Sequence, residues 1–543
     1  MTMWFLLFGC VHPVPYQTDT LAGGDTTTSD EATNPTWTEN TTETTTEIEE
    51  TTSTDTTAPV PTCDPIIAMT TDMWLEGEMF QAQITCSGEG DLNLSEITVS
   101  GVAGLQVEHT GALSWQTNLD SSGRYDLTLS VSTPGQPDQI SVWPFWVAES
   151  TDADNILANP VDYTEEWGIP VVHVTVDSNI SQSYTTAEVW FYGDHYDAQI
   201  KVRGAASSGY PKNSYTIRFP NTDLNANPVG MGNKDHLVLI TSFDDNSYIR
   251  QKLVYDTWAD MATHANEDRL TPRTFFAVVY INNAYHGLYT ACDRIDNHFV
   301  EEMGLSNGGN LYKAVSHDAN FYLKSNLHAG YEKTEGSPPQ GWPHAFDDLD
   351  SLVYYAGSSS AETFMDDASE WISVEEFMDW FLLVHYASAG DSAGKNSYIY
   401  HDPAVLTWSD TRFRYVPWDF NHAFGQGWYT YRIGPDVYED FANANQIFAH
   451  LQDHPQTQAA LWARFHDLVE NGPLNPTTLR ERVDGYYQRV DLSAQRDWQH
   501  WSSQYANYWG GSNTNDHDQE RAYIYDWLEQ RHEWMMSYHP PSE

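Results

Sequence analysis

The sequence predicts a multidomain protein in which an all-β sandwich is followed by a larger α+β domain. The chain has 543 residues, which is more than one compact core usually holds. Its early part alternates apolar and polar residues with the two-residue period of strands, whereas its later part adds segments with helical spacing. Aromatic residues make up 14% of the chain and supply material for large buried cores.

Residues 1–16 resemble a signal peptide with a bacterial lipobox. Cys10 follows a short apolar run, Met3–Leu7, and in a lipobox this cysteine carries the lipid after cleavage. No Lys or Arg precedes the run, so an ordinary hydrophobic N-terminus is the alternative. We expect a lipid anchor through Cys10 and an extracytoplasmic location in the cell envelope, at the outer membrane or cell surface. No other apolar stretch is long enough for a transmembrane helix.

Residues 17–61 are dominated by Thr, Glu, Asp and Ser, and apolar residues are scarce. Such a composition cannot offset the entropy of ordering and predicts an extended, disordered linker.

Residues 62–150 read as all-β. The segments Ile97–Val99 and Tyr125–Val131 alternate like half-buried strands, and turn residues such as Ser121–Gly123 separate them. The pattern resembles an immunoglobulin-like or cadherin-like sandwich.

Three cysteines lie beyond the lipobox. Cys63 and Cys86 share the predicted sandwich, where they form either a disulfide or two buried thiols. Cys292 is expected to be buried and inert.

Residues 151–543 mix helices and strands. The pattern predicts a hairpin over 196–219, a helix over 246–262, a second hairpin over 275–289, a helix from 373 and a largely helical tail over 476–537. Asn282-Asn283 suits the tight turn of the second hairpin because Asn tolerates positive φ. Ser373 and Glu376 have the spacing of a capping box.

The charge balance limits the possible partners. The chain has 77 acidic and 25 basic residues, a net charge of −52, so nucleic acid and anionic membrane surfaces are not expected as partners. A nucleotide would need a local cationic site or a metal ion inside this negative field.

A small-residue loop joins the strands of the first hairpin. Gly204, Ser207 and Ser208 let backbone N–H groups approach a phosphate, unless the loop merely closes the hairpin. The cations that would neutralise the phosphate are Arg203, Lys212 and Arg218.

Two further segments carry candidate chemistry. Asp391 and Asn396 have the spacing of the kinase catalytic loop, in which the Asp accepts a hydroxyl proton and the Asn holds a metal. Asp419-Phe420 follows an apolar strand, where kinases place the metal-binding Asp of Asp-Phe-Gly. The alternatives are a solvated Asp391 after a helix stop and an Asp419 that caps a turn. The order of hairpin, helix, hairpin, long helix, Asp-x4-Asn and Asp-Phe is that of a protein kinase.

Several runs between about 155 and 430 resemble the CotH kinase family. They are Arg203-Gly204, Pro211–Tyr215, Asp245–Leu253, Tyr280–Tyr289, Asn310–Lys313 and Pro417–Phe420. The resemblance implies an atypical protein-kinase-like fold that transfers phosphate from ATP to protein hydroxyls. It implies that Asp391 is the catalytic Asp and that Asn396 and Asp419 bind Mg²⁺ or Mn²⁺.

The resemblance has departures. The family often has an acid two residues after the metal Asp, where this chain has Asn421. The cation that positions ATP is open among Lys212, Arg218 and Lys313. Lys212 ranks first by its place in the signature, with a surface lysine in a turn as the alternative.

Two functions follow from the sequence. The first is an atypical secreted kinase that phosphorylates Ser or Thr hydroxyls of surface or coat proteins, with ATP and Mg²⁺ or Mn²⁺ as cofactors. The second is an inactive surface adhesion or scaffold protein that keeps the fold, since little ATP is found outside the cytoplasm. Zinc-protease and serine-hydrolase motifs are absent from the sequence.

Overall fold

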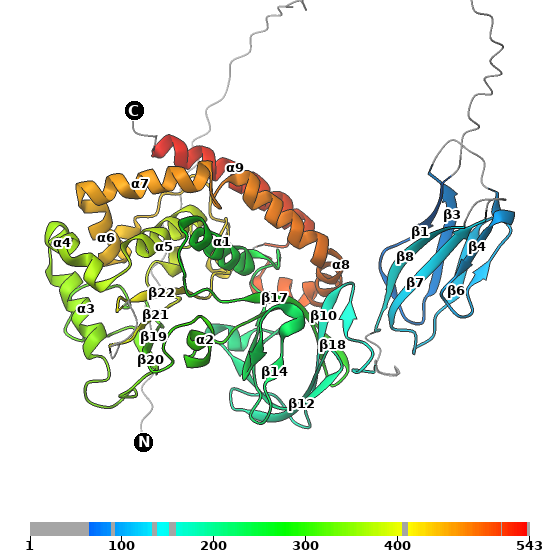
Figure 1. Cartoon of the computed structure of the whole chain (residues 1–543), viewed down its shortest axis with the longest axis horizontal. Coiled ribbons are helices and arrows are strands. Elements are labelled where there is room, and N and C mark those ends of the chain that lie inside the picture. The colour runs from blue at the N-terminus through cyan, green and yellow to red at the C-terminus, as the bar shows by residue number, and fades with distance from the viewer. Residues whose placement is uncertain are drawn as a thin grey trace, which may run out of the picture. The chain divides into compact units, whose positions relative to one another are not determined.

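The structure is a computed structural model that describes residues 64–87, 93–132, 138–150, 159–403, 411–511 and 513–539 (Figure 1). The predicted lipobox around Cys10, the linker over 17–61 and Cys63 lie outside these residues. None of the helices in the described ranges is both long and apolar enough to cross a bilayer. The chain has an all-β part followed by an α+β part, as the sequence predicts.

The all-β part consists of two four-stranded sheets, with strand orders β1-β3-β6-β5 and β2-β8-β7-β4. The strands are β1 (Pro65–Met69), β2 (Trp74–Leu75), β3 (Met79–Cys86), β4 (Ile97–Ser100), β5 (Gln106–Val107), β6 (Ala112–Gln116), β7 (Gly123–Val131) and β8 (Gln139–Ala148). Both sheets contribute side chains to one hydrophobic cluster, in which Phe80 of β3 contacts Phe145 of β8. The alternation in β7 places Leu127 and Leu129 in this cluster.

Cys86 ends β3 and is disulfide-bonded. The free-thiol alternative is therefore wrong for Cys86, and its partner lies outside the described residues. Cys292 is free and buried, as the sequence predicts.

The first half of the α+β part is an eight-stranded sheet in the order β11-β12-β13-β16-β18-β17-β10-β9. An additional pairing of β10 with β11 closes the sheet on itself around its own hydrophobic cluster. Its strands are β9 (Glu165–Glu166), β10 (Ile169–Thr175), β11 (Thr185–Phe191), β12 (Asp194–Arg203), β13 (Ser214–Arg218), β16 (His236–Thr241), β17 (Thr274–Ile281) and β18 (Ala284–Cys292). A small two-stranded sheet, β14 (Leu224–Asn225) and β15 (Asn233–Lys234), leads into β16.

The second half contains most of the helices and a four-stranded sheet in the order β20-β19-β21-β22. Its strands are β19 (Asn310–Ala314), β20 (Tyr331–Glu335), β21 (Ser397–His401) and β22 (Arg414–Pro417). The helices of the chain are α1 (Arg250–Ala265), α2 (Asn297–Glu302), α3 (Asp347–Ser358), α4 (Ala361–Trp371), α5 (Val374–Ala387), α6 (Gln446–Asp453), α7 (Pro455–Glu470), α8 (Pro476–Trp509) and α9 (His517–Tyr538).

Both predicted hairpins are present, as β12–β13 and β17–β18. Asn282 and Asn283 form the second turn with φ of 50° and 64°, the left-handed values for which Asn is suited. The helix predicted over 246–262 is α1, and the helical tail is α8 and α9.

The helix predicted from 373 is α5, but its capping box is wrong. Ser373 makes no side-chain cap hydrogen bond. Glu376 instead accepts hydrogen bonds from the backbone N–H of Tyr415, at 2.6 Å, and from Arg414. The carboxylate faces β22 because a buried charge gains more from an arginine than from a helix end.

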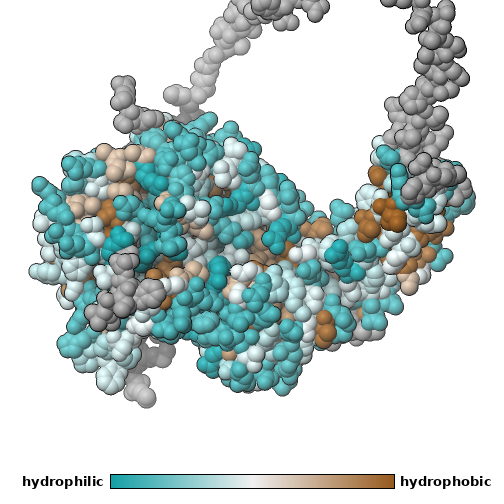
Figure 2. Space-filling view, viewed as in Figure 1, coloured by the Kyte–Doolittle hydropathy of each residue, from teal (hydrophilic) through white to brown (hydrophobic). Residues whose placement is uncertain are grey.

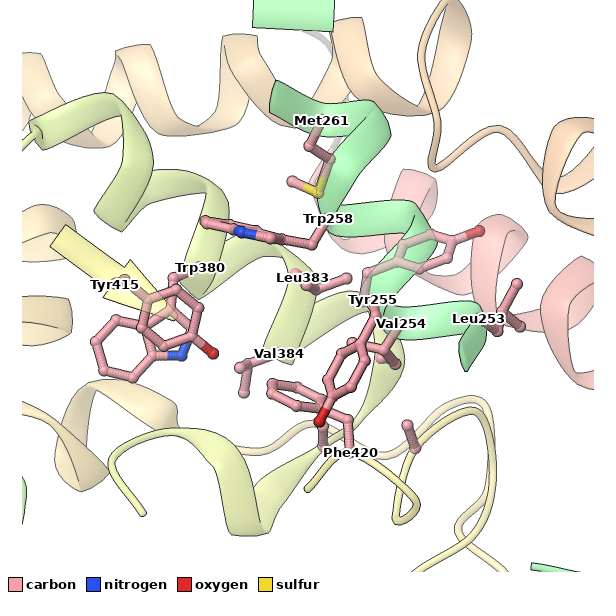
Figure 3. Packing of buried hydrophobic residues seen from close by; sticks show 14 of the residues in the cluster. Leu253, Val254, Tyr255, Trp258, Met261, Trp380, Leu383, Val384, Tyr415 and Phe420 are labelled. Atoms are coloured by element: carbon pink, nitrogen blue, oxygen red, sulfur yellow. The ribbon is translucent and has the colours of Figure 1, made fainter. Parts of the chain in front are cut away.

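A large aromatic core joins α1 to α5 (Figure 3). Trp258 of α1 contacts Tyr415, and Trp380 of α5 stacks on Tyr415 at 4.2 Å between ring centroids. Phe420 belongs to the same core. The core thus fixes the backbone on both sides of Asp419, the residue that the sequence analysis expects to bind a metal ion. The face seen in Figure 2 is mostly hydrophilic, in keeping with 77 acidic residues.

Candidate functional site

The main cleft is a cavity of about 210 Å³ between the first hairpin and the segments around Asp391 and Asp419. It is lined by Arg203–Ser207, Tyr210, Ser214, Ile240, Thr241, Asp244, Lys313–Val315, Asp391, Lys395, Asn396, Trp418, Asp419, Asn421, His422 and Trp428. The three residues that the sequence assigns to catalysis and metal binding therefore share one cavity.

Asp391 lies in a short 3-10 turn, Gly390–Ser392, directly after α5. Trp380 anchors this turn from the core, since its Nε1 donates to the carbonyl of Ser392 at 3.1 Å. Asn396 Nδ2 donates to Asp391 Oδ2 at 2.9 Å and to the backbone carbonyl of Asp419 at 3.3 Å. Asn396 thus links the two acidic segments.

The Asp391 carboxylate is held ionised. Burial alone would raise its pKa, but the hydrogen bond and charge of Lys395, together with His317, lower the pKa below its usual value. Lys395 Nζ lies 2.9 Å from Oδ2 and 3.2 Å from Oδ1. The side chain remains partly open to the cleft.

Asp419 follows β22 with a left-handed backbone, φ 60°. Such a conformation is costly for a residue other than glycine and persists where the surroundings impose it. The backbone N–H of Asp419 donates to the hydroxyl of Tyr255 at 3.0 Å, and Phe420 is buried in the core that α1 and α5 share (Figure 3). These contacts turn the Asp419 carboxylate into the cleft.

The Asp419 side chain is exposed to the cleft, whose walls limit its contact with water. The reduced solvation raises the pKa of Asp419, while Arg203 and His422 oppose the rise. Among the described residues, none donates a hydrogen bond to this carboxylate or to Asn396 Oδ1. The Asp419 carboxylate and the Asn396 amide oxygen therefore belong to residues that line the same cleft, and neither group accepts a hydrogen bond from a described residue.

A third carboxylate, Asp244, was not foreseen from the sequence. It accepts hydrogen bonds from Asn421 Nδ2 at 2.7 Å and from the Tyr210 hydroxyl at 3.1 Å, and it lies 3.6 Å from His422 Nε2. Burial lowers the pKa of His422, but Asp244, Asp419 and Asp391 together raise it above its usual value. The sequence signal that bears on Asp244 is Asn421, which stands where the family often has an acidic residue. In this chain Asp244, from another segment, supplies a carboxylate beside Asn421.

Two cations of the cleft, Arg203 and Lys313, have no carboxylate within ion-pair distance in the described part of the chain. Arg203 lies over the ring of Trp418, 5.1 Å from its centroid, and Lys313 over Tyr398 at 5.9 Å. Burial lowers the pKa of Lys313, and Arg203 lowers it further. Both cations are therefore available to an anion.

The small-residue loop is compact at Gly204 and Ser207, as its small side chains suggest. Gly204 has φ 99°, and a Cβ there would lie 2.0 Å from Ser207 Oγ, so only glycine fits. Gly204 and Ser207 line the cleft, whereas Ser208 does not and donates its hydroxyl to the Ala205 carbonyl at 2.8 Å.

Lys212, expected to contact ATP, lies elsewhere. Its side chain is only 1% exposed, and its Nζ donates to Asp497 Oδ1 at 2.6 Å and to the Leu288 carbonyl at 2.7 Å. A surface position in a turn is equally excluded. The ammonium group pairs with the buried Asp497 carboxylate, which is far away in the sequence. No local sequence pattern could therefore reveal this ion pair.

Arg218 does not line the cleft either. It donates to Gln199 and lies over the ring of Tyr184 at 4.6 Å. The distance along β13 explains this, because Arg218 stands four residues beyond Ser214, which does line the cleft.

Comparison with known proteins shows to which family the chain belongs. The CotH kinase protein family matches residues 200–535, which is more than half of the chain. The chain is also 24% identical over 270 residues to the inner spore coat protein H of Bacillus subtilis (strain 168), which covers 48% of this chain and 67% of that protein. The chain therefore belongs to the CotH kinase protein family.

Proposed function

We propose that the main cleft transfers the γ-phosphate of ATP to Ser or Thr hydroxyls of a protein. The observation that carries this proposal is the meeting of Asp391, Asn396 and Asp419 in one cavity with two unpaired cations, Arg203 and Lys313. Phosphoryl transfer depends mainly on positioning and on electrostatic stabilisation, and this set of groups provides both.

The donor atoms fit a hard divalent cation. Asp419 and Asn396 offer a carboxylate and an amide oxygen, the ligand types that Mg²⁺ and Mn²⁺ prefer. We propose that these two residues hold the ion, with Asp244 as a further acidic group at the same cavity. The bound ion would neutralise phosphate charge, which answers the repulsion expected from a chain of net charge −52.

Asp391 is suited to the acceptor hydroxyl. Its lowered pKa keeps the carboxylate ionised near neutral pH, so it can orient the hydroxyl and accept its proton at Oδ1 or Oδ2. Lys395 lies against both oxygens and would position the carboxylate while adding positive charge close to the transferred group.

The phosphates would contact the other wall of the cleft. Arg203 and Lys313 replace Lys212 as the proposed phosphate-binding cations, and the loop at Gly204 and Ser207 brings backbone close to the ligand. We propose that the eight-stranded sheet and the helical half correspond to the two lobes of an atypical kinase fold.

The remaining parts suggest the setting of the reaction. We propose that the two N-terminal sheets are an immunoglobulin-like or cadherin-like sandwich and that Cys10 anchors the protein to the envelope. The name of the similar spore coat protein supports an acceptor among coat or surface proteins.

Incubation of the full chain with radiolabelled ATP, Mn²⁺ and a Ser-rich acceptor protein tests the proposal. Label on the acceptor, with the mass increase of one phosphate per site by mass spectrometry, is the expected result. Absence of both transfer and any ATP-dependent rise in melting temperature would favour the scaffold alternative instead.

A further inference from the structure

A second cavity, the inner pocket, adjoins the main cleft. Its volume is about 190 Å³, and it shares Arg203, Lys313 and Trp418 with the cleft. Its lining is Tyr184, Lys201, Arg203, Thr216, Val238, Arg294, Ile295, Lys313, Glu332, Thr334, Tyr398 and Trp418.

The charge of the inner pocket is opposite to that of the chain. Four of the 25 basic residues line it, against one acidic residue, Glu332. Three of these cations, Lys201, Arg203 and Lys313, have no ion-pair partner among the residues described. Only Arg294 approaches a carboxylate, at 3.4 Å from Asp296. In a chain with 77 acids, such unpaired cations point to an anion from outside.

Aromatic rings hold these cations in place. Lys201 Nζ lies 4.7 Å from the Tyr184 ring centroid, and Arg203 and Lys313 lie over Trp418 and Tyr398. A cation thus lies over each of these rings, and Arg218 lies over the Tyr184 ring as well. The pocket consequently offers charged donors more readily than bare ring faces, which favours an anion over a stacked base.

The four cations of the inner pocket repel one another when no anion is bound. Burial lowers the pKa of Lys201, and the neighbouring charges of Arg294, Arg203 and Arg218 lower it further. Burial and Arg203 also lower the pKa of Lys313, while Asp419 and Glu332 oppose this change. Like charges held close together with incomplete compensation are a local conflict of the kind that functional sites retain.

We propose that the inner pocket is a phosphate-binding site in which Lys201, Arg203 and Lys313 bind the anion and the hydroxyl of Thr216 completes the donor set. The phosphate comes from one of two sources, the nucleotide in the main cleft or a separate phosphorylated small molecule. The first source rests on the proposed function, whereas the second does not.

Calorimetric titration of the full chain with inorganic phosphate, without divalent metal and at constant ionic strength set with NaCl, tests the site. Wild type is expected to bind phosphate, whereas Lys201→Met weakens binding about tenfold, the effect of losing one charge-assisted hydrogen bond. Lys201→Arg should retain binding. Lys324→Met, which removes the same charge outside both cavities, should match wild type.

Unchanged phosphate affinity in Lys201→Met would overturn the proposal. So would a titration with NaCl alone that gives the same binding signal as the titration with phosphate. Lys201→Gln provides a second variant should Lys201→Met fold poorly, as judged by circular dichroism. Asp391→Asn should bind phosphate like wild type even where it abolishes transfer, which separates this site from the catalytic proposal.

Repeating the titration with a saturating non-hydrolysable ATP analogue and Mg²⁺ identifies the source. Loss of phosphate binding assigns the pocket to a phosphate of the nucleotide. Retained binding assigns it to a separate small molecule.

Discussion

Lys212 Nζ lies 2.6 Å from Asp497 Oδ1, and this buried ion pair joins the first hairpin to the middle of α8. The same carboxylate oxygen accepts the backbone N–H of Leu288 at 2.7 Å. Gly287 leaves room for the pair, because a Cβ there would lie 2.2 Å from Asp497 and 2.9 Å from Lys212. A lysine of the family signature thus stabilises the fold, and we propose that other cations bind the phosphates.

Replacing Lys212 by Met should destabilise the protein by about 3–5 kcal/mol, because Asp497 then remains charged and buried without a cationic partner. Urea unfolding of the full chain measures the loss. The double variant Lys212→Met, Asp497→Leu should recover part of it. If Lys212→Met left stability unchanged and weakened ATP binding, Lys212 would have to be assigned to the ATP site instead.

Asp391→Asn should reduce phosphoryl transfer by about 10²–10⁴-fold, because an amide cannot accept the proton of the acceptor hydroxyl. ATP binding should persist, since Arg203 and Lys313 are untouched. Radiolabel transfer and the ATP-dependent melting shift measure the two effects separately. Asp197→Asn, an exposed position on β12, provides the control.

Asp419→Asn should abolish the dependence of nucleotide binding on Mn²⁺, because the proposed metal loses its charged ligand. The melting temperature with ATP is compared with and without Mn²⁺ for wild type and variant. An equal metal-dependent shift in both proteins would remove Asp419 from the metal site.

His286 should make stability depend on pH. Burial, and then the charge of Lys212, lower its pKa to about 3, so the folded protein keeps the ring neutral. The unfolded chain binds a proton below about pH 6.5, so this stability is fully present above that pH and is lost as the pH falls towards 3.

His286→Gln should therefore lose less stability than wild type between pH 7.5 and 5, by up to about 2 kcal/mol. Urea unfolding at both pH values gives the difference. His344→Gln serves as the control, since that side chain is 78% exposed. Parallel pH dependence in wild type and His286→Gln would contradict the assignment.

Local patterns predicted elements of both the all-β and the α+β part well. The Asn282-Asn283 turn and the strand alternation of β7 depend on neighbouring residues, so the sequence reveals them directly. The capping box at Ser373 failed because its partner, Glu376, finds Arg414 and Tyr415 across the fold.

The sequence by itself determined the order of the parts, the family, and Asp391, Asn396 and Asp419 as the acidic and amide groups that line one cleft. Only the tertiary structure decided the cations and the third carboxylate, Asp244. Ion pairing depends on distance in space. Asp497, distant in sequence, pairs with Lys212, whereas Arg203 and Lys313 converge from separate strands and have no carboxylate within ion-pair distance among the described residues.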